Sequence, residues 1–203
     1  MVYGVIGPVN GLAAAKNTRP VKILAVGDSL TAGYGLVAPD GFVPRLEAAL
    51  KADGYNVKIV NAGVSGDTTA GGKARLGWSL AEKPDAVLLE LGANDALRGI
   101  SPAASEANLE AMLRALQDRQ IPVLLIGMKS PPNLGADYVT AFEAIYPRLA
   151  ARYKAPLYPF FLDGVAANSA LNQPDGIHPN AEGVHEIVRR FLPVVAKFLD
   201  ALS

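Results

Sequence analysis

The chain has 203 residues, of which 50% are hydrophobic, and its 19 Lys plus Arg are balanced by 19 Asp plus Glu. A neutral chain lacks the basic face that nucleic acids or anionic lipid surfaces require, so we expect no nucleic-acid partner. The lack of cysteine excludes disulfides and thiolate chemistry, two histidines are too few for a His-rich metal centre, and no apolar run is long enough for stable membrane insertion.

Residues 1–20 differ from the rest of the chain. They are apolar and nearly uncharged, and the three alanines at 13–15 resemble a small-residue cleavage site, although a basic start is missing and Pro8 interrupts the apolar stretch. We therefore expect an N-terminal extension or the remnant of a signal peptide, followed by a single domain at 21–203. An export remnant predicts a periplasmic or secreted protein, and a plain extension leaves a cytoplasmic location open.

Short apolar runs then alternate with longer segments of helical period. The expected strands are 21–26, 57–60, 86–91, 123–126 and the weaker 155–157, and the expected helices are 42–52, 70–81, 102–119, 138–153 and 181–202. Near-continuous apolar runs suit strands that are buried on both faces of a parallel sheet. The alternation predicts a three-layer α/β/α sandwich that binds its ligand beyond the carboxyl ends of the strands.

Ser29 follows the first predicted strand, in the run Gly27-Asp28-Ser29-Leu30. A serine at a strand end can present its hydroxyl to a cleft, but a helix N-cap or a turn has the same local pattern. The segment lacks the lysine of a Walker phosphate loop, and it is not the G-x-S-x-G elbow of α/β-hydrolases. Ser29 is therefore a candidate nucleophile, and this role requires other residues that activate its hydroxyl.

The segments after two further predicted strands carry N–H donors that can hydrogen-bond to a negatively charged atom. Gly66 lies in the loop after the second predicted strand, where a glycine lets backbone N–H groups approach a ligand. Asn94 follows the third predicted strand and offers a side-chain amide. An ordinary turn and an Asx turn explain the same residues equally well.

The loop before the last predicted helix carries Asp175 and His178. A neutral imidazole can take a serine proton only when its other nitrogen is held as N–H, which a nearby carboxylate does. Three positions separate the two residues, so one loop can deliver both. The second histidine, His185, lies inside a helical pattern with no carboxylate placed to orient it, and we expect it to be a surface residue.

With these residues the chain resembles the SGNH, or GDSL, hydrolase family, which is named for invariant Ser, Gly, Asn and His positions. The likeness spans 21–203 and is closest to the bacterial thioesterase I/protease I/lysophospholipase and arylesterase group. Its blocks occur in the family's order, as Gly27-Asp28-Ser29-Leu30, Gly66, Gly92-Ala93-Asn94-Asp95 and Asp175-Gly176-Ile177-His178. The resemblance implies a flavodoxin-like sandwich around a five-stranded parallel sheet.

The same resemblance implies roles for the site residues. Ser29 would attack a carbonyl carbon, His178 would take its proton, and Asp175 would orient the imidazole. The oxyanion hole would combine the backbone N–H groups of Ser29 and Gly66 with the side-chain amide of Asn94. This arrangement predicts acyl transfer through a serine-bound intermediate, without a cofactor or a metal.

The loop 95–101 matches a segment that lines the acyl pocket in such enzymes, so Leu97 and Ile100 are expected to contact substrate. The expected partner is a small acyl ester or thioester with a short- to medium-chain acyl or aryl group, and lysophospholipids are further candidates. A carbohydrate esterase or an acyltransferase would use the same triad, and a non-catalytic binding domain would keep the same fold. Differences in the loop 128–135 leave the acyl preference open.

Several residues near these blocks suggest structural roles. Asp28, Asp67 and Asp95 are expected to fix the loops by local hydrogen bonding. Glu90 falls within an otherwise apolar strand, so its carboxyl must be paired or protonated. Trp78, the only tryptophan, is expected to pack in the core from its helical face.

Overall fold

The computed structural model describes residues 19–202, so most of the predicted N-terminal extension lies outside the described residues. A single parallel sheet has the strand order β2-β1-β3-β4-β5. Its strands are β1 (Val21–Gly27), β2 (Val57–Gly63), β3 (Ala86–Glu90), β4 (Val123–Ile126) and β5 (Leu157–Tyr158). Chain order reverses between β1 and β3, so loops leaving these two strands diverge and open a crevice at their carboxyl ends.

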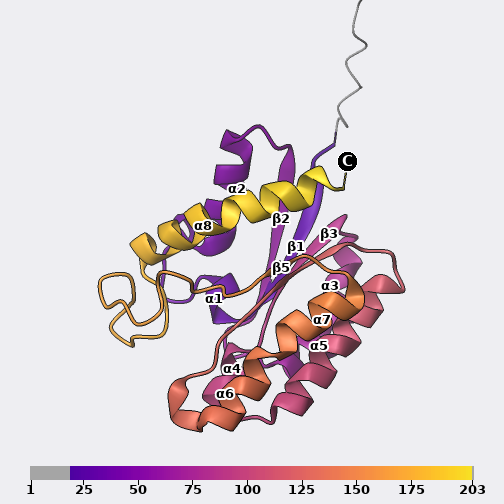
Figure 1. Cartoon of the computed structure of the whole chain (residues 1–203). Helices are drawn as coiled ribbons and strands as arrows, with labels where there is room; N and C mark the ends of the chain where they lie inside the picture. The colour runs from indigo at the N-terminus through magenta and orange to yellow at the C-terminus, as the bar shows by residue number, and fades with distance from the viewer. Residues whose placement is uncertain (1–18, 203) are drawn as a thin grey trace, which may run out of the picture.

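Helices cover both faces of this sheet (Figure 1). On one face α2 packs against α8, and on the other α5 contacts both α3 and α7. The helices are α1 (Ser29–Ala32), α2 (Phe42–Ala52), α3 (Thr69–Ser79), α4 (Ala93–Leu97), α5 (Pro102–Gln117), α6 (Ala136–Glu143), α7 (Ile145–Tyr153) and α8 (Ala181–Asp200). Short 3₁₀ turns lie at Ala38–Asp40, Leu80–Glu82 and Pro132–Leu134. The result is the predicted three-layer sandwich.

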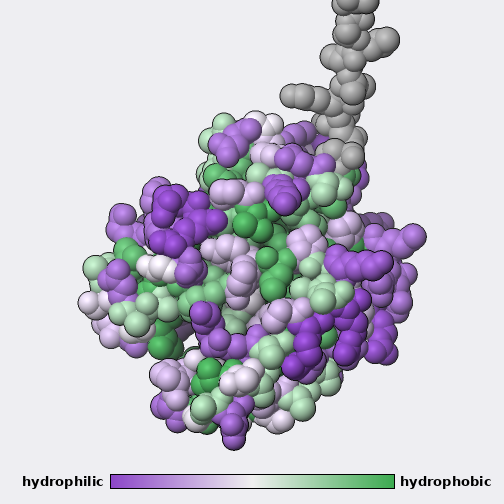
Figure 2. Space-filling view, viewed as in Figure 1, coloured by the Kyte–Doolittle hydropathy of each residue, from purple (hydrophilic) through white to green (hydrophobic). Residues whose placement is uncertain are grey.

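The hydrophobic core lies between the sheet and both helix layers. Every residue of β3 is buried, and so are the last five residues of β1, because helices cover these central strands from both sides. Each large apolar side chain that is fully buried contributes about 1.5–3 kcal/mol to the free energy of unfolding. Hydrophilic side chains gather over the outer surfaces of α8 and of α5 and α7 (Figure 2), where ion pairs such as Arg148–Glu106 link neighbouring helices. This rigid frame positions the loops at the strand ends.

The weak strand expected at 155–157 lies at Leu157–Tyr158, and two further predictions differ from the structure for identifiable reasons. The expected helix 138–153 is two helices, interrupted at Ala144, because Pro147 has no N–H to bond the carbonyl of Glu143. The prediction that Trp78 packs in the core is wrong, since its exposed fraction is 82%. The buried face of α3 includes Leu76, and a residue two positions further along a helix points about 200° away.

Within residues 19–202, no helix combines the length and the apolar character that crossing a membrane requires. The first described residue, Arg19, forms an ion pair with Asp85 beside the start of β3.

Candidate active site

The structure brings Ser29, His178 and Asp175 together. Ser29 is the first residue of α1, directly after β1, and the side chain of Asp28 caps this short helix by accepting the N–H of Leu30 at 3.0 Å. The Nε2 atom of His178 lies 2.9 Å from the Ser29 hydroxyl oxygen. Its Nδ1 atom lies 2.7 Å from a carboxylate oxygen of Asp175. The imidazole thus bridges the hydroxyl and the carboxylate.

The loop that carries Asp175 is held by its own side chain. One carboxylate oxygen accepts the backbone N–H groups of Ile177 and His178, both at 3.0 Å, while the other faces the imidazole. The hydrogen bond from the His178 backbone N–H, reinforced by the imidazole and by the Ile177 N–H, lowers the pKa of Asp175 to about 2. Asp175 is therefore ionised at neutral pH and can hold the Nδ1–H tautomer. The imidazole also packs on Tyr34, with 4.6 Å between ring centroids.

Gly66 and Asn94 lie at the same end of the sheet. Gly66 follows β2 with a φ of 85°, which lies in the left-handed region that favours glycine. The side-chain nitrogen of Asn94, on α4, donates to the Asp67 carbonyl at 2.9 Å and lies 3.3 Å from a carboxylate oxygen of Asp28. Within residues 19–202, the backbone N–H groups of Ser29 and Gly66 have no protein acceptor, so both are free for a ligand.

A cavity of about 300 Å³ opens beside the Ser29 hydroxyl and the imidazole of His178. Leu97 contributes to its lining. Ile100 does not line this cavity, and its carbonyl instead accepts the Tyr138 hydroxyl at 2.7 Å. Most of the surface is apolar and comes from segments that follow β3, β4 and β5, with side chains that include Leu97, Met128, Pro131, Phe160, Leu162 and Ile177.

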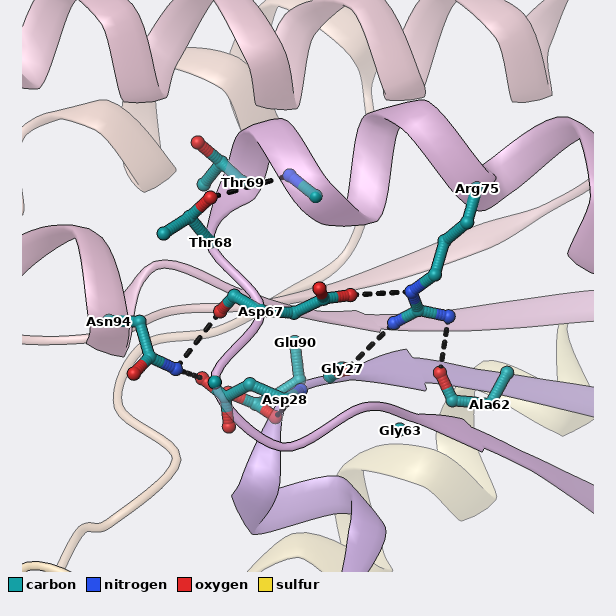
Figure 3. Close-up of polar contacts among 12 residues, drawn as sticks. Gly27, Asp28, Ala62, Gly63, Asp67, Thr68, Thr69, Arg75, Glu90 and Asn94 are labelled. Carbon is teal, nitrogen blue, oxygen red and sulfur yellow. Dashed lines mark hydrogen bonds and ion pairs between the residues drawn. The ribbon is translucent and has the colours of Figure 1, made fainter.

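The three aspartates take the loop-fixing roles predicted for them. Asp28 caps α1, as described above. Asp67 pairs with Arg75 of α3 (Figure 3). Asp95 accepts the backbone N–H of Thr69 at 2.8 Å and its hydroxyl at 2.6 Å, which ties α4 to the start of α3. Each carboxylate joins two segments near the carboxyl ends of the strands.

Glu90 ends the central strand β3 and lies directly beneath the Ser29 turn. It accepts the Thr31 hydroxyl at 2.8 Å and the Asp28 backbone N–H at 3.4 Å, while its second carboxyl oxygen has no partner among the described residues. Burial, aided by the nearby Asp28 carboxyl, raises the pKa of Glu90 well above its usual range. Burial also raises the pKa of Asp28 to about 6. Two acidic groups therefore share a buried site behind the candidate nucleophile.

We expect Glu90→Gln to flatten the pH dependence of stability. The raised pKa values mean that protonated Asp28 and Glu90 favour the folded state below about pH 4, and that this contribution is lost as pH rises through their folded-state values. Replacing Glu90 removes one of these groups. Between about pH 5 and pH 8 the wild type should therefore lose more unfolding free energy than the variant.

Urea unfolding at the two pH values measures this difference. Glu182→Gln, which changes an exposed carboxyl at the start of α8, is the matched control. Its unfolding free energy should change between the two pH values as much as that of the wild type. An equal change in unfolding free energy between the two pH values for wild type and Glu90→Gln would contradict the assignment of a buried titrating carboxyl.

Sequence reasoning missed Arg75 and Thr31. The partner of Glu90 could not be named because Thr31 is 59 positions away along the chain. In the sequence, Arg75 is one of several cations in predicted helices. Two of its three acceptors are backbone carbonyls, and every residue type has a backbone carbonyl, so the sequence does not indicate these contacts. His185 lies exposed on α8, as predicted. Within residues 19–202, no group of His, Asp and Glu side chains is arranged to hold a metal ion.

Comparisons with known proteins identify the family of the chain. The model of the GDSL-like Lipase/Acylhydrolase family matches residues 25–185. The chain is 43% identical over 178 residues to Esterase TesA of Pseudomonas aeruginosa, which covers 87% of this chain and 89% of the relative. It is 41% identical over 173 residues to Thioesterase 1/protease 1/lysophospholipase L1 of Escherichia coli K12, covering 84% and 79%. It superposes on AlinE4, an SGNH-hydrolase family esterase, with a TM-score of 0.76, 50% identity and coverage of 88% and 96%.

The matched region includes the turn that carries Ser29, both proposed donor loops and the loop with Asp175 and His178. The family resemblance and the fold that the sequence predicts are both confirmed. The chain belongs to the GDSL-like lipase/acylhydrolase family, and it is a hydrolase of ester bonds.

Proposed function

We propose that this hydrolase is a serine esterase in which Ser29 forms an acyl-enzyme, His178 is the general base and Asp175 orients the imidazole. The observation that carries this proposal is the pair of imidazole contacts, 2.9 Å to the Ser29 hydroxyl and 2.7 Å to Asp175. With the Nδ1–H donated to an ionised carboxylate, the Nε2 lone pair faces the hydroxyl proton.

The reaction then proceeds in two halves. The Ser29 oxygen bonds to the carbonyl carbon as its proton moves to Nε2 of His178, and the carbonyl oxygen becomes an oxyanion. Collapse of this intermediate breaks the bond to the alcohol or thiol, which leaves with the proton from His178. Water, activated by the same imidazole, attacks the acyl-enzyme and releases the carboxylic acid.

The oxyanion would be held by the backbone N–H groups of Ser29 and Gly66 and by the Asn94 amide. Both hydrogens of that amide have acceptors in the structure, the Asp67 carbonyl at 2.9 Å and the Asp28 carboxylate at 3.3 Å. The longer contact is the weaker one, so it is the one that an oxyanion can replace. The bond to Asp67 then keeps the amide aimed at the substrate. Such donors, fixed before the reaction, are usually the largest electrostatic contribution to catalysis.

The substrates that fit are carboxylic esters and thioesters with short- to medium-chain acyl or aryl groups, and lysophospholipids are candidates. The mostly apolar lining of a cavity of about 300 Å³ supports an acyl or aryl group better than a sugar. The name of the Escherichia coli relative includes thioesterase and lysophospholipase activities, which is consistent with this range. We infer no cofactor, because the three side chains and the donors supply every proton transfer in the scheme.

A chain-length series of p-nitrophenyl esters tests this function. Each added methylene that enters the cavity should raise kcat/KM up to about four-fold, the equivalent of about 0.8 kcal/mol per buried CH₂, until the cavity is full. Leu97→Ser should reduce the gain for long chains and leave acetate hydrolysis within about two-fold of wild type. Acyl-CoA and lysophospholipid, assayed beside the esters, define the leaving groups accepted. A flat profile, or hydrolysis confined to acetylated sugars, would contradict the proposed substrate class.

A periplasmic or secreted location, which residues 1–20 suggest, stays a prediction. Expression of the full chain in a bacterial host, followed by intact mass measurement of each cell fraction, tests it. Cleavage near the alanines at 13–15 in the periplasmic fraction is the expected result, and uncleaved protein confined to the cytoplasm would contradict it.

A further inference from the structure

Arg75 is a partly buried cation at the centre of a polar cluster between α3 and the sheet (Figure 3). Its side chain is 19% exposed, and its guanidinium points to the carboxyl ends of β1 and β2. It donates to the Ala62 carbonyl at 2.7 Å, to the Gly27 carbonyl at 2.9 Å and to the Asp67 carboxylate. One side chain therefore ties two strand ends to the loop that follows the second strand.

Two of the three acceptors of this guanidinium, Gly27 and Asp67, lie within two residues of a proposed oxyanion donor. Gly27 is two residues before Ser29, and its carbonyl also accepts the backbone N–H of Val64 from the loop after β2. Asp67 directly follows Gly66, and its own carbonyl accepts the side-chain amide of Asn94 at 2.9 Å. Short paths therefore connect the guanidinium to all three donors. One runs along the chain from Gly27 to Ser29, and the other runs through Asp67 to Gly66 and Asn94.

The chemistry of the cluster requires an arginine. A guanidinium is planar and offers five N–H donors in a fixed fork, whereas a lysine ammonium acts as a point charge. Three acceptors in different segments can be held at fixed spacing only by such a fork. The packing is tight as well: a Cβ atom on Gly71 would lie 2.5 Å from a carboxylate oxygen of Asp67. Gly71 therefore leaves the space that the Asp67 carboxylate occupies.

We propose that Arg75 is a positioning residue that sets the orientation of the Asn94 amide in the oxyanion hole. It touches no reacting atom and acts through Asp67, whose carboxylate it holds and whose carbonyl orients the Asn94 amide. The inference rests on the proposed function, because it assigns Arg75 to the donors used in that scheme. Misplacing catalytic groups by about 1 Å can cost about 10²-fold in rate.

A double-mutant cycle tests this role with wild type, Arg75→Met, Asn94→Ala and the double variant, using p-nitrophenyl butyrate. We expect Arg75→Met to lower kcat about 10- to 100-fold with KM within about three-fold of wild type. On the Asn94→Ala background, the same change should lower kcat by no more than about three-fold, because the group that it positions is already gone.

Two further variants separate positioning from general destabilisation. Leu76→Ala removes a buried side chain next to Arg75, so it should lower Tm while kcat at 25 °C stays within about two-fold of wild type. Arg75→Lys keeps the charge and loses the fork, so it should show the same kcat loss and the same coupling even if Arg75→Met does not fold.

Equal kcat losses on both backgrounds, or near wild-type kcat in Arg75→Met and Arg75→Lys, would overturn the proposal. The proposed function fails separately. If Asn94→Ala itself retains wild-type kcat, the oxyanion assignment is wrong, whereas an inactive Asn94→Ala beside a fully active Arg75→Met rejects only the role of Arg75.

Discussion

Ser29→Ala is expected to lower kcat for p-nitrophenyl esters roughly 10⁵- to 10⁶-fold, the scale seen when the nucleophile of a serine hydrolase is removed. The substitution deletes the oxygen that lies 2.9 Å from the imidazole and leaves the cap of α1, made by Asp28, in place. Circular dichroism and Tm should therefore stay close to wild type. Steady-state kinetics with purified protein measure the loss.

The two histidines provide a matched comparison. His178→Ala should match the loss in Ser29→Ala, and combining the two should cost little more, because residues that act as one unit are strongly non-additive. His185→Ala, which changes an exposed side chain on α8, should stay within about three-fold of wild type. Strong activity in His178→Ala, or its loss in His185→Ala, would contradict the choice of base.

Asn94→Ala is expected to lower kcat about 10²- to 10³-fold while KM changes little, because the amide would act on charge that develops only in the transition state. The loss includes any shift of the Gly66 loop, since the bond to the Asp67 carbonyl disappears as well. Kinetics on acetate and butyrate esters should show the same factor, because the effect lies at the carbonyl and not in the acyl cavity.

Asn108→Ala is the control for this variant. Asn108 lies on α5, and its amide donates to the Thr69 hydroxyl at 3.2 Å, so the change removes a comparable hydrogen bond from the same helix layer. Its kcat should stay within about two-fold of wild type. Turnover close to wild type in Asn94→Ala, or an increase in KM alone, would remove Asn94 from the oxyanion hole.

Much of the fold follows from local patterns in the sequence. The buried strands are short runs of β-branched residues and leucine, and β4 at Val123–Ile126 matches the expected range in full. Such runs report burial on both faces, which only a covered parallel sheet provides. The predicted helix ends at Phe42 and Ala52 also agree with α2. The very short α1 and α4 were missed because four or five residues hold too little periodicity.

Site residues could be predicted where a strand end fixes their place. Ser29 and Asn94 follow β1 and β3, which flank the switch point of the sheet, so their proximity follows from topology. The orientation of a side chain on a helix requires the phase of that helix, which explains the error at Trp78. Contacts with distant backbone carbonyls, such as those of Arg75, have no signature in residue type.

Stoichiometric labelling with a serine-directed fluorophosphonate tests the central claim most directly. Intact mass spectrometry of the wild type should show one phosphonyl group per chain, and peptide mapping should place it on Ser29. Ser29→Ala should remain unlabelled, and His178→Ala should react far more slowly because the hydroxyl loses its base. Labelling of Ser29→Ala at the wild-type rate, or a wild type that stays unlabelled while it hydrolyses esters, would contradict the account.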